Sequence, residues 1–230
     1  MTWIKICGMT NLEDAMAAVE AGADAVGFVF YERSPRNISI EAAREIVEKL
    51  PRTIEKIGVF AGDSIGRAVQ TARKAGLDAL QVYPLTYGER QVDSLHARAI
   101  GADGLRTYWA LPVSVFLGEG SKNLNGFAQP GPEGVCDPLF LDSGSSQQPG
   151  GTGRAFDWHE AASAVGNLSR HQKIVIAGGL TPASVCEAMG VLKPWGVDVA
   201  SGVEASPRKK DSEKLRAFVR AVREMDGKAS

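Results

Sequence analysis

A cysteine and an aspartate each end or follow a short apolar segment, at positions where a polar side chain could do chemistry. Cys7 ends the segment Ile4–Cys7, and Asp142 directly follows the apolar run 139–141. Burial at the edge of an apolar interior disfavours a carboxylate, so we predict that Asp142 is a neutral acid that donates a proton. Two interpretations of Cys7 are open, a small buried hydrophobic residue or a catalytic thiol.

Two cationic residues stand where they could serve this chemistry. Lys5 lies two residues before Cys7, and alternate residues of a strand point to the same side. If that side is interior, Lys5 is predicted to lie beneath Cys7 and to favour the thiolate. Arg36 lies in the turn Ser34-Pro35-Arg36 and is either a solvated charge or a bidentate partner for a carboxylate or phosphate.

Glycine-rich turns further along the chain are predicted to bind phosphate. Gly178 and Gly179 follow one apolar run, and Ser201 and Gly202 follow the next. Converging backbone N–H groups at helix N-termini bind phosphate, although the same glycines could serve ordinary turns. The polar loop 143–153 is open to two interpretations, a mobile surface loop or a lid whose Gly-Thr-Gly end adds N–H groups to this site.

Other catalytic and binding chemistries find little support. The three histidines, His96, His159 and His171, fall in or beside predicted helices, so histidine catalysis is not expected. Cys136 and Cys186 are far from Cys7 and from each other, form no zinc spacing, and are treated as structural. No carboxylate-rich metal cluster is visible, and no GxGxxG follows the first strand.

The composition bounds the class of protein. The 230 residues are 44% hydrophobic, and 26 basic against 27 acidic residues give a net charge of −1. This balance argues against a nucleic-acid or polybasic membrane surface. No apolar run approaches the roughly 18 residues of a membrane span, and no signal-peptide pattern precedes the first strand. We therefore expect a reduced, cytoplasmic protein that binds a small phosphorylated molecule, as a monomer or homodimer.

Eight predicted strands, most followed by a helix, supply the elements that position these residues. They are 4–7, 25–30, 56–60, 79–82, 104–108, 138–141, 173–177 and 197–200. Strands that alternate with helices form a parallel sheet, and eight units in this length fit a (β/α)₈ TIM barrel. We expect one domain over 1–230, with a final helix over 211–225 and a frayed tail from about 226. Active sites of such barrels lie at the C-terminal ends of the strands, where Cys7 and Asp142 are found.

Local signals define several boundaries. The pattern Gly-x-Asp recurs at Gly22, Gly76, Gly101 and Gly196, and each copy is predicted to be a helix-to-strand turn. Thr10 is predicted to open the first helix in a capping box with Glu13. Thr181 and Pro182 are predicted to be the N-cap and first residue of the helix after the Gly178 turn. The segment 118–136 is predicted to hold a fifth helix that is short, irregular or partly mobile.

Several motifs, taken together, resemble the phosphoribosylanthranilate isomerase family of tryptophan biosynthesis. They are KICGMT from Lys5, GADAVGFVFYERSPRNIS, KIGVF, LFLDSGSSQQPGGTGRAFDW, IAGGLTP and GVDVASGVEASPRKKD. The resemblance implies a barrel enzyme without cofactors that performs an Amadori rearrangement of N-(5-phosphoribosyl)anthranilate. By motif, Cys7 matches the general base, Asp142 the general acid and Arg36 the residue that holds the anthranilate carboxylate. The phosphate site is matched by Gly178, Gly179, Ser201 and Gly202, with help from Gly153.

The chain departs from the family pattern on two strands. Tyr83 stands where the family has the histidine of a QLHG-type motif, and Trp109 lies where an IKA-like motif is usual. These departures concern the pocket wall near the fourth and fifth strands and leave open an altered rate or a somewhat different aryl group. Two other functions also stay open. One is an isomerase for a related aminoimidazole sugar phosphate, which would more naturally use two aspartates. The other is a non-catalytic phosphate-metabolite sensor, which would need neither Cys7 nor Asp142.

Overall fold

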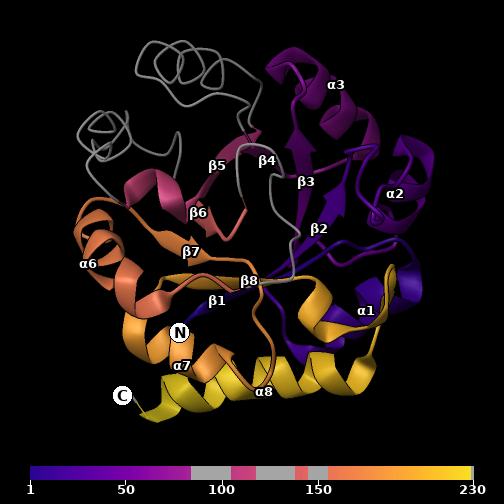
Figure 1. The fold of residues 1–230 in the computed structure, drawn as a ribbon. Coiled ribbons are helices and arrows are strands. Elements are labelled where there is room, and N and C mark those ends of the chain that lie inside the picture. The colour runs from indigo at the N-terminus through magenta and orange to yellow at the C-terminus, as the bar shows by residue number, and fades with distance from the viewer. Residues whose placement is uncertain (84–104, 118–137, 145–154, 229–230) are drawn as a thin grey trace.

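Eight parallel strands close into a barrel in the computed structural model, which describes residues 1–83, 105–117, 138–144 and 155–228 (Figure 1). The strands are β1 (Trp3–Cys7), β2 (Ala25–Val29), β3 (Glu55–Ala61), β4 (Ala79–Tyr83), β5 (Arg106–Pro112), β6 (Leu139–Asp142), β7 (Ile174–Ile176) and β8 (Gly196–Val199). Each strand pairs with the next, and β1 closes the barrel on β8 with Lys5 opposite Asp198. The predicted (β/α)₈ barrel is confirmed.

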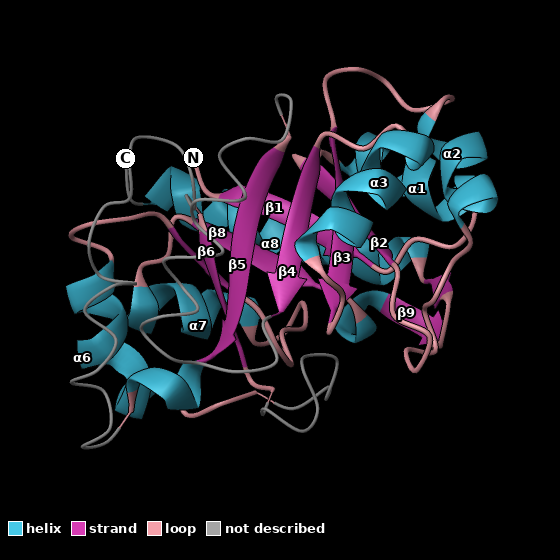
Figure 2. Cartoon of the chain, turned by 90° about the horizontal axis from the view of Figure 1, so that it is seen from above, coloured by secondary structure: helices cyan, strands magenta, loops and turns pink. Residues whose placement is uncertain are grey.

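Helices cover the outside of the barrel and bury one face against the strands (Figure 1). They are α1 (Leu12–Ala21), α2 (Ile40–Val47), α3 (Ile65–Ala75), α6 (Trp158–Leu168), α7 (Val185–Leu192) and α8 (Ser212–Lys228). Figure 2 shows β3, β4 and β5 side by side, as their register requires. Among the helices described, none combines the length and the apolar character needed to cross a membrane.

Strand alternation divides the core into two layers. Ile4 and Ile6 on β1 pack outward against the helices, while Lys5 and Cys7 point into the barrel. The inward layer is largely apolar, with side chains such as Phe140 and Val175. Polar inward side chains therefore stand out against an apolar lining.

The Gly-x-Asp turns are confirmed at two positions and wrong at a third. Asp24 and Asp78 follow left-handed glycines and accept hydrogen bonds from the N–H groups of strand residues Ile4 and Lys56. Asp198, in contrast, lies inside β8. The left-handed residue at the end of α7 is Lys193, so the turn precedes Gly196. The copy at Gly101 lies outside the described residues.

Several predicted boundaries differ from the structure. Asn11, not Thr10, caps α1, and its side chain accepts from the Asp14 N–H at 2.8 Å. Helix α7 begins at Val185 instead of Pro182, because Thr181 and Ser184 first form a turn through mutual backbone-to-side-chain hydrogen bonds.

Three further predictions concern the end of β5, the end of α8 and the fifth helix. Strand β5 runs to Pro112, four residues beyond the predicted end, and α8 continues past 225 to Lys228. The predicted fifth helix over 118–136 lies outside the described residues.

The strand pair within residues 204–210, after β8, was not predicted. The 3₁₀ turn η3 (Ser201–Val203) leads into β9 (Glu204–Ser206), which pairs antiparallel with β10 (Lys209–Lys210). We call β9, β10 and the residues between them, 204–210, the β9–β10 hairpin. It packs beside the start of α1, where Lys209 pairs with Glu13 at 2.8 Å.

Candidate active site

A cavity of about 340 Å³ opens at the C-terminal ends of the strands. Its lining brings together most of the site residues predicted from separate parts of the sequence, namely Cys7, Arg36, Asp142, Gly178, Gly179 and Ser201. Gly202 lies behind this lining, against the backbone of Leu180 and Thr181. Gly153 and most of the proposed lid loop, residues 145–153, lie outside the described residues.

Asp142 is buried at the end of β6 and accepts two well-formed hydrogen bonds. The Tyr83 hydroxyl donates to Oδ2 at 2.9 Å, and the Gly144 N–H donates to Oδ1 at 3.1 Å. Burial raises the pKa of Asp142, while the hydrogen bond from Tyr83 opposes the rise. Because the net pKa is raised, Asp142 keeps its proton more readily than an exposed aspartate does.

The Cys7 thiol is also buried, and its surroundings act on it in opposite directions. Burial raises the pKa of Cys7, the positive charge of Lys5 lowers it, and the negative charge of Asp198 raises it. Lys210 adds a smaller lowering effect, but the net pKa lies above the ordinary thiol value. In this structure the thiol is therefore held more strongly in its neutral form than a free cysteine.

Lys5 lies in the barrel interior on the same side as Cys7, as predicted. It is fully buried, and its Nζ pairs with Asp198 Oδ2 at 2.8 Å. Burial opposes its charge, but Asp198 and Cys7 outweigh this effect, so the pKa of Lys5 is raised. Lys5 is thus a cation beside the thiol. Burial of the thiol nevertheless raises the Cys7 pKa by more than Lys5 lowers it.

Gly27 on β2 leaves the space that Cys7 and Lys5 occupy. It is the register partner of Cys7. A Cβ atom on Gly27 would lie 2.8 Å from Cys7 Sγ and 3.1 Å from Lys5 Nζ. The ammonium and thiol can therefore share this layer of the barrel only because residue 27 has no side chain.

The predicted phosphate turns lie next to each other. Gly178 and Gly179 both adopt left-handed conformations, with φ values of 83° and 67°. Among the described residues, no backbone partner accepts a hydrogen bond from their N–H groups. A Cβ on Gly202 would collide with the Leu180 carbonyl, so the turn after β8 packs directly on the turn after β7. This geometry brings backbone donors of two loops to one end of the cavity.

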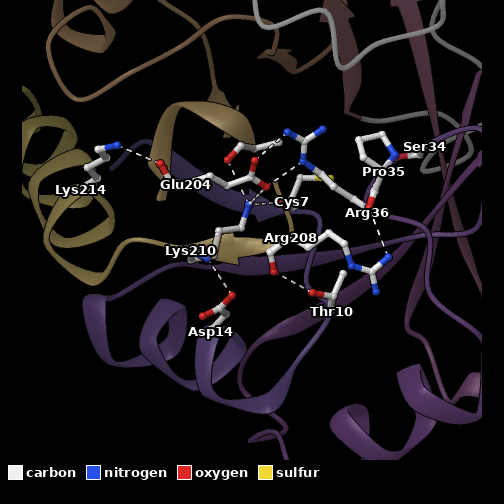
Figure 3. Close-up of polar contacts among 11 residues, drawn as sticks. Cys7, Thr10, Asp14, Ser34, Pro35, Arg36, Glu204, Arg208, Lys210 and Lys214 are labelled. Carbon is white, nitrogen blue, oxygen red and sulfur yellow. Dashed lines mark hydrogen bonds and ion pairs between the residues drawn. The ribbon is translucent and has the colours of Figure 1, made fainter. Parts of the chain in front are cut away.

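Arg36 reaches the cavity but is not an isolated charge. Its Nε and Nη2 donate to Glu204 Oε1 and Oε2 at 2.8 and 2.7 Å, a bidentate pair. Lys210 Nζ donates to Glu204 Oε1 at 3.2 Å, to the Cys7 carbonyl at 2.7 Å and to the Ala200 carbonyl at 3.0 Å. In Figure 3 the Glu204 carboxylate lies between the two cations. The hydrogen bond and charge of Glu204 raise the pKa of Arg36.

Sequence reasoning missed four polar residues around the cavity: Tyr83, Asp198, Glu204 and Lys210. Asp198 was assigned to a turn, although a charged residue at an inward strand position was a usable signal. Glu204 and Lys210 stand out only once the β9–β10 hairpin folds back over β1. Within the described ranges, no group of three or more His, Cys, Asp or Glu side chains is arranged to hold a metal ion.

The histidines lie away from these contacts. His159 is in α6, which begins at Trp158, and His171 follows that helix. Neither lines the cavity, and His96 lies outside the described residues. Cys186 lies in α7, where its Sγ contacts the Ala221 carbonyl at 3.6 Å.

Comparison with known proteins identifies close similarity along the whole chain. The family profile described as N-(5′-phosphoribosyl)anthranilate (PRA) isomerase matches residues 4–95 and 122–221. An N-(5′-phosphoribosyl)anthranilate isomerase of Geobacter sp. (strain M21) is 39% identical over 227 residues, which cover 98% of this chain and 100% of the relative. The Pelobacter propionicus protein of the same name is 40% identical over 231 residues, 97% of each chain.

Solved structures show the same similarity in three dimensions. A crystal structure of monomers of the dimeric phosphoribosylanthranilate isomerase from Thermotoga maritima matches with a TM-score of 0.78 and 32% identity, over 97% of this chain and 100% of that one. A phosphoribosylanthranilate isomerase in complex with reduced 1-(o-carboxyphenylamino)-1-deoxyribulose 5-phosphate matches with a TM-score of 0.75 and 32% identity, with the same coverage.

Proposed function

The chain belongs to the N-(5′-phosphoribosyl)anthranilate isomerase family, an isomerase family of tryptophan biosynthesis, and from this premise we propose how its own residues perform the rearrangement. The reaction converts N-(5′-phosphoribosyl)anthranilate to 1-(2-carboxyphenylamino)-1-deoxyribulose 5-phosphate. We propose Asp142 as general acid and Cys7 as general base. The observation that carries this proposal is that a buried carboxyl of raised pKa and a thiol beside a buried lysine line one cavity.

In the first step Asp142 supplies the proton. The neutral carboxyl protonates the ring oxygen of the ribose, and the bond between C1′ and that oxygen breaks. The lone pair of the anthranilate nitrogen forms the new C1′–N double bond, which leaves a positively charged Schiff base and an Asp142 carboxylate. The raised pKa of Asp142 supports this role, because it increases the protonated fraction at neutral pH.

In the second step the Cys7 thiolate, formed once the thiol has lost its own proton, removes the proton from C2′ and becomes a neutral thiol. The C2′–H electrons form a C1′–C2′ double bond and neutralise the Schiff base, which gives an enolamine. The enolamine then gains a proton at C1′ and loses one from the C2′ hydroxyl, which gives the ketone. The positive Schiff base itself favours the thiolate. It therefore offsets part of the effect of burial, which raises the Cys7 pKa.

The remaining site residues bind the two ends of the substrate. We propose that Arg36 holds the anthranilate carboxylate, because Arg36 lines the cavity and Glu204 takes only one edge of its guanidinium. The turns at Gly178–Gly179 and Ser201–Gly202, with Gly153, are proposed to hold the phosphate group through backbone N–H groups.

Consumption of the fluorescent anthranilate substrate by the purified protein tests this function. We expect turnover of phosphoribosylanthranilate and far slower turnover of the aminoimidazole sugar phosphate of histidine biosynthesis. A rate on the aminoimidazole compound that equals or exceeds the rate on the anthranilate compound would overturn the substrate assignment. Binding of either compound without turnover would overturn the catalytic roles of Cys7 and Asp142.

A further inference from the structure

The β9–β10 hairpin holds Arg36 by its backbone as well as by its side chain. Arg208 Nη1 donates to the Pro35 carbonyl at 3.3 Å and to the Asn37 carbonyl at 3.0 Å, the two residues that flank Arg36. The Arg208 carbonyl in turn accepts from the Thr10 hydroxyl at 2.8 Å. These contacts tie the turn after β2 to the loop after β1, and Figure 3 shows those of Arg208 with Pro35 and Thr10.

Glu204 holds one edge of the Arg36 guanidinium and leaves the other available. A guanidinium presents five N–H donors in a planar fork. Glu204 takes the edge formed by Nε and Nη2, so the edge formed by Nη1 and the second Nη2 hydrogen remains for a ligand. No described residue accepts a hydrogen bond from Nη1. Both side chains are at least nine-tenths buried, so water competes little for this pair.

Lys210 fixes Glu204 from the opposite side. Its ammonium donates one hydrogen bond to Glu204 and one each to the carbonyls of Cys7 and Ala200. The lysine is 4% exposed and all three of its donors are used. The Glu204 carboxylate is therefore anchored to the ends of β1 and β8, and it cannot follow Arg36 if the arginine side chain moves.

The Arg36 side chain lies directly against Gly8, which has no side chain of its own. Gly8 follows Cys7 and has a φ of 83°. A Cβ on it would come within 2.5 Å of Arg36 Cδ and 3.3 Å of Arg36 Cγ. The arginine stem thus crosses the backbone directly above the end of β1, and its rotation is restricted on that side.

From these contacts we propose that Glu204 is a positioning residue that sets the preference for substrates with a carboxylate on the aromatic ring. It acts through Arg36, so this role rests on the proposed binding of the substrate carboxylate by Arg36. Glu204 takes one edge of the guanidinium of Arg36, a residue that lines the cavity, so the other edge is left for a planar carboxylate that can accept two parallel hydrogen bonds. Because the arginine is oriented before the ligand arrives, less rotamer freedom is lost on binding.

A pair of matched ligands tests this role. One ligand is reduced 1-(o-carboxyphenylamino)-1-deoxyribulose 5-phosphate, a product analogue that carries the carboxylate. The other is its phenylamino counterpart, which lacks the carboxylate. Calorimetric titration of both gives the ratio of their affinities for each variant. We expect the native protein to prefer the carboxylated analogue and Glu204→Gln to lose about tenfold or more of that preference. The affinity of Glu204→Gln for the analogue without a carboxylate should remain within about threefold of the native value. This result would also show that the site is folded.

Two further variants keep the outcome clear. Glu204→Asp retains the charge with a shorter reach, and its affinity ratio should lie between those of the native protein and Glu204→Gln. Glu13→Gln makes the same chemical change in α1, at the exposed glutamate that pairs with Lys209 of the β9–β10 hairpin. This variant should keep the native ratio of the two affinities.

The possible results separate this role from the proposed function. A native protein that binds both analogues equally would overturn the assignment of Arg36 to the carboxylate. The native protein could instead prefer the carboxylated analogue while Glu204→Gln or Glu204→Asp shows the same affinity ratio as the native protein. That result would overturn the role of Glu204 and leave the proposed function standing. An equal loss of affinity for both analogues would likewise overturn it, since that pattern belongs to a general structural defect.

Discussion

Burial raises the pKa of both the acid and the base proposed for this site, which shifts each toward its neutral form. Asp142 is assisted in its role, because an acid must keep its proton until the ring oxygen takes it. Cys7 is opposed, because a base must be ionised. The two cations near the thiol, Lys5 and Lys210, reduce this opposition without removing it. The charge that develops on the substrate is therefore part of the proposed mechanism.

Replacement of the two charges closest to the thiol should move its pKa in opposite directions. Lys5→Met removes a positive charge and should raise the Cys7 pKa, whereas Asp198→Asn removes a negative charge and should lower it. The pH dependence of Cys7 alkylation by iodoacetamide, in a Cys136→Ser/Cys186→Ser background, measures both shifts. An unchanged thiol pKa in Lys5→Met would contradict the role given to Lys5.

Tyr83 should tune the acid. Its hydroxyl donates to Asp142 and lowers the pKa of that carboxyl, so Tyr83→Phe should raise the Asp142 pKa further. Carbon-13 NMR titration of labelled aspartate carboxyls measures the change. Tyr108→Phe is the matched control, because the Tyr108 hydroxyl donates to Glu55 instead. A pKa that falls or stays constant in Tyr83→Phe would show that this hydrogen bond does not stabilise the carboxylate.

At the residue scale, the sequence predicted the residues that carry recognisable motifs and missed those that support them. Cys7, Asp142 and Arg36 follow strands or turns that could be located from apolar runs and a proline. Glu204 and Tyr83 gained their partners only through contacts between segments 168 and 59 positions apart. No local pattern encodes such long-range pairs.

At the scale of elements, β2 and the β9–β10 hairpin shape the rim around Cys7 from two sides. Gly27 on β2 leaves space beside the thiol, and Lys210 on β10 binds the Cys7 carbonyl. The eight strands were predictable because buried parallel strands read as short apolar runs. The hairpin was not, because β9 and β10 have three and two residues and carry mainly polar side chains.

Gly27→Ala tests the space that β2 leaves. The new methyl group would lie 2.8 Å from Cys7 Sγ, so the thiol must move and the variant should lose roughly 1–3 kcal/mol of unfolding free energy. Urea unfolding and the rate of Cys7 alkylation measure the two effects. Gly190→Ala in α7 meets open space and should be neutral or slightly stabilising. Equal behaviour of the two variants would show that β2 does not crowd the thiol.

At the scale of the whole molecule, the last helix, α8, is bound to the first residues of the chain. The Asp226 carboxylate accepts from the Thr2 hydroxyl at 2.6 Å and from the Thr2 N–H at 2.9 Å. Arg223 donates to the carbonyls of Thr2 and Gly22. The alternation of strands and helices predicted the barrel, but these closing contacts join residues more than 200 positions apart and could not be read locally.

Phe218→Ala tests how much the barrel depends on this last helix. Phe218 is fully buried in the core, so its truncation should lower the unfolding free energy by about 3–5 kcal/mol. The exposed neighbour Arg220 provides the control, since Arg220→Ala should change stability by less than about 0.5 kcal/mol. Urea titration followed by circular dichroism measures both. A loss below about 1 kcal/mol in Phe218→Ala would indicate that α8 is not part of the cooperative core.

The turnover of phosphoribosylanthranilate by Cys7→Ser and Asp142→Asn tests the proposed acid and base most directly. Each change keeps the size of the side chain and removes its proton chemistry, so turnover should fall by roughly 10²–10⁴-fold in each. Cys186→Ser, which alters a thiol in α7 away from the cavity, should keep native turnover. Native turnover in either Cys7→Ser or Asp142→Asn would contradict the catalytic role proposed for that residue.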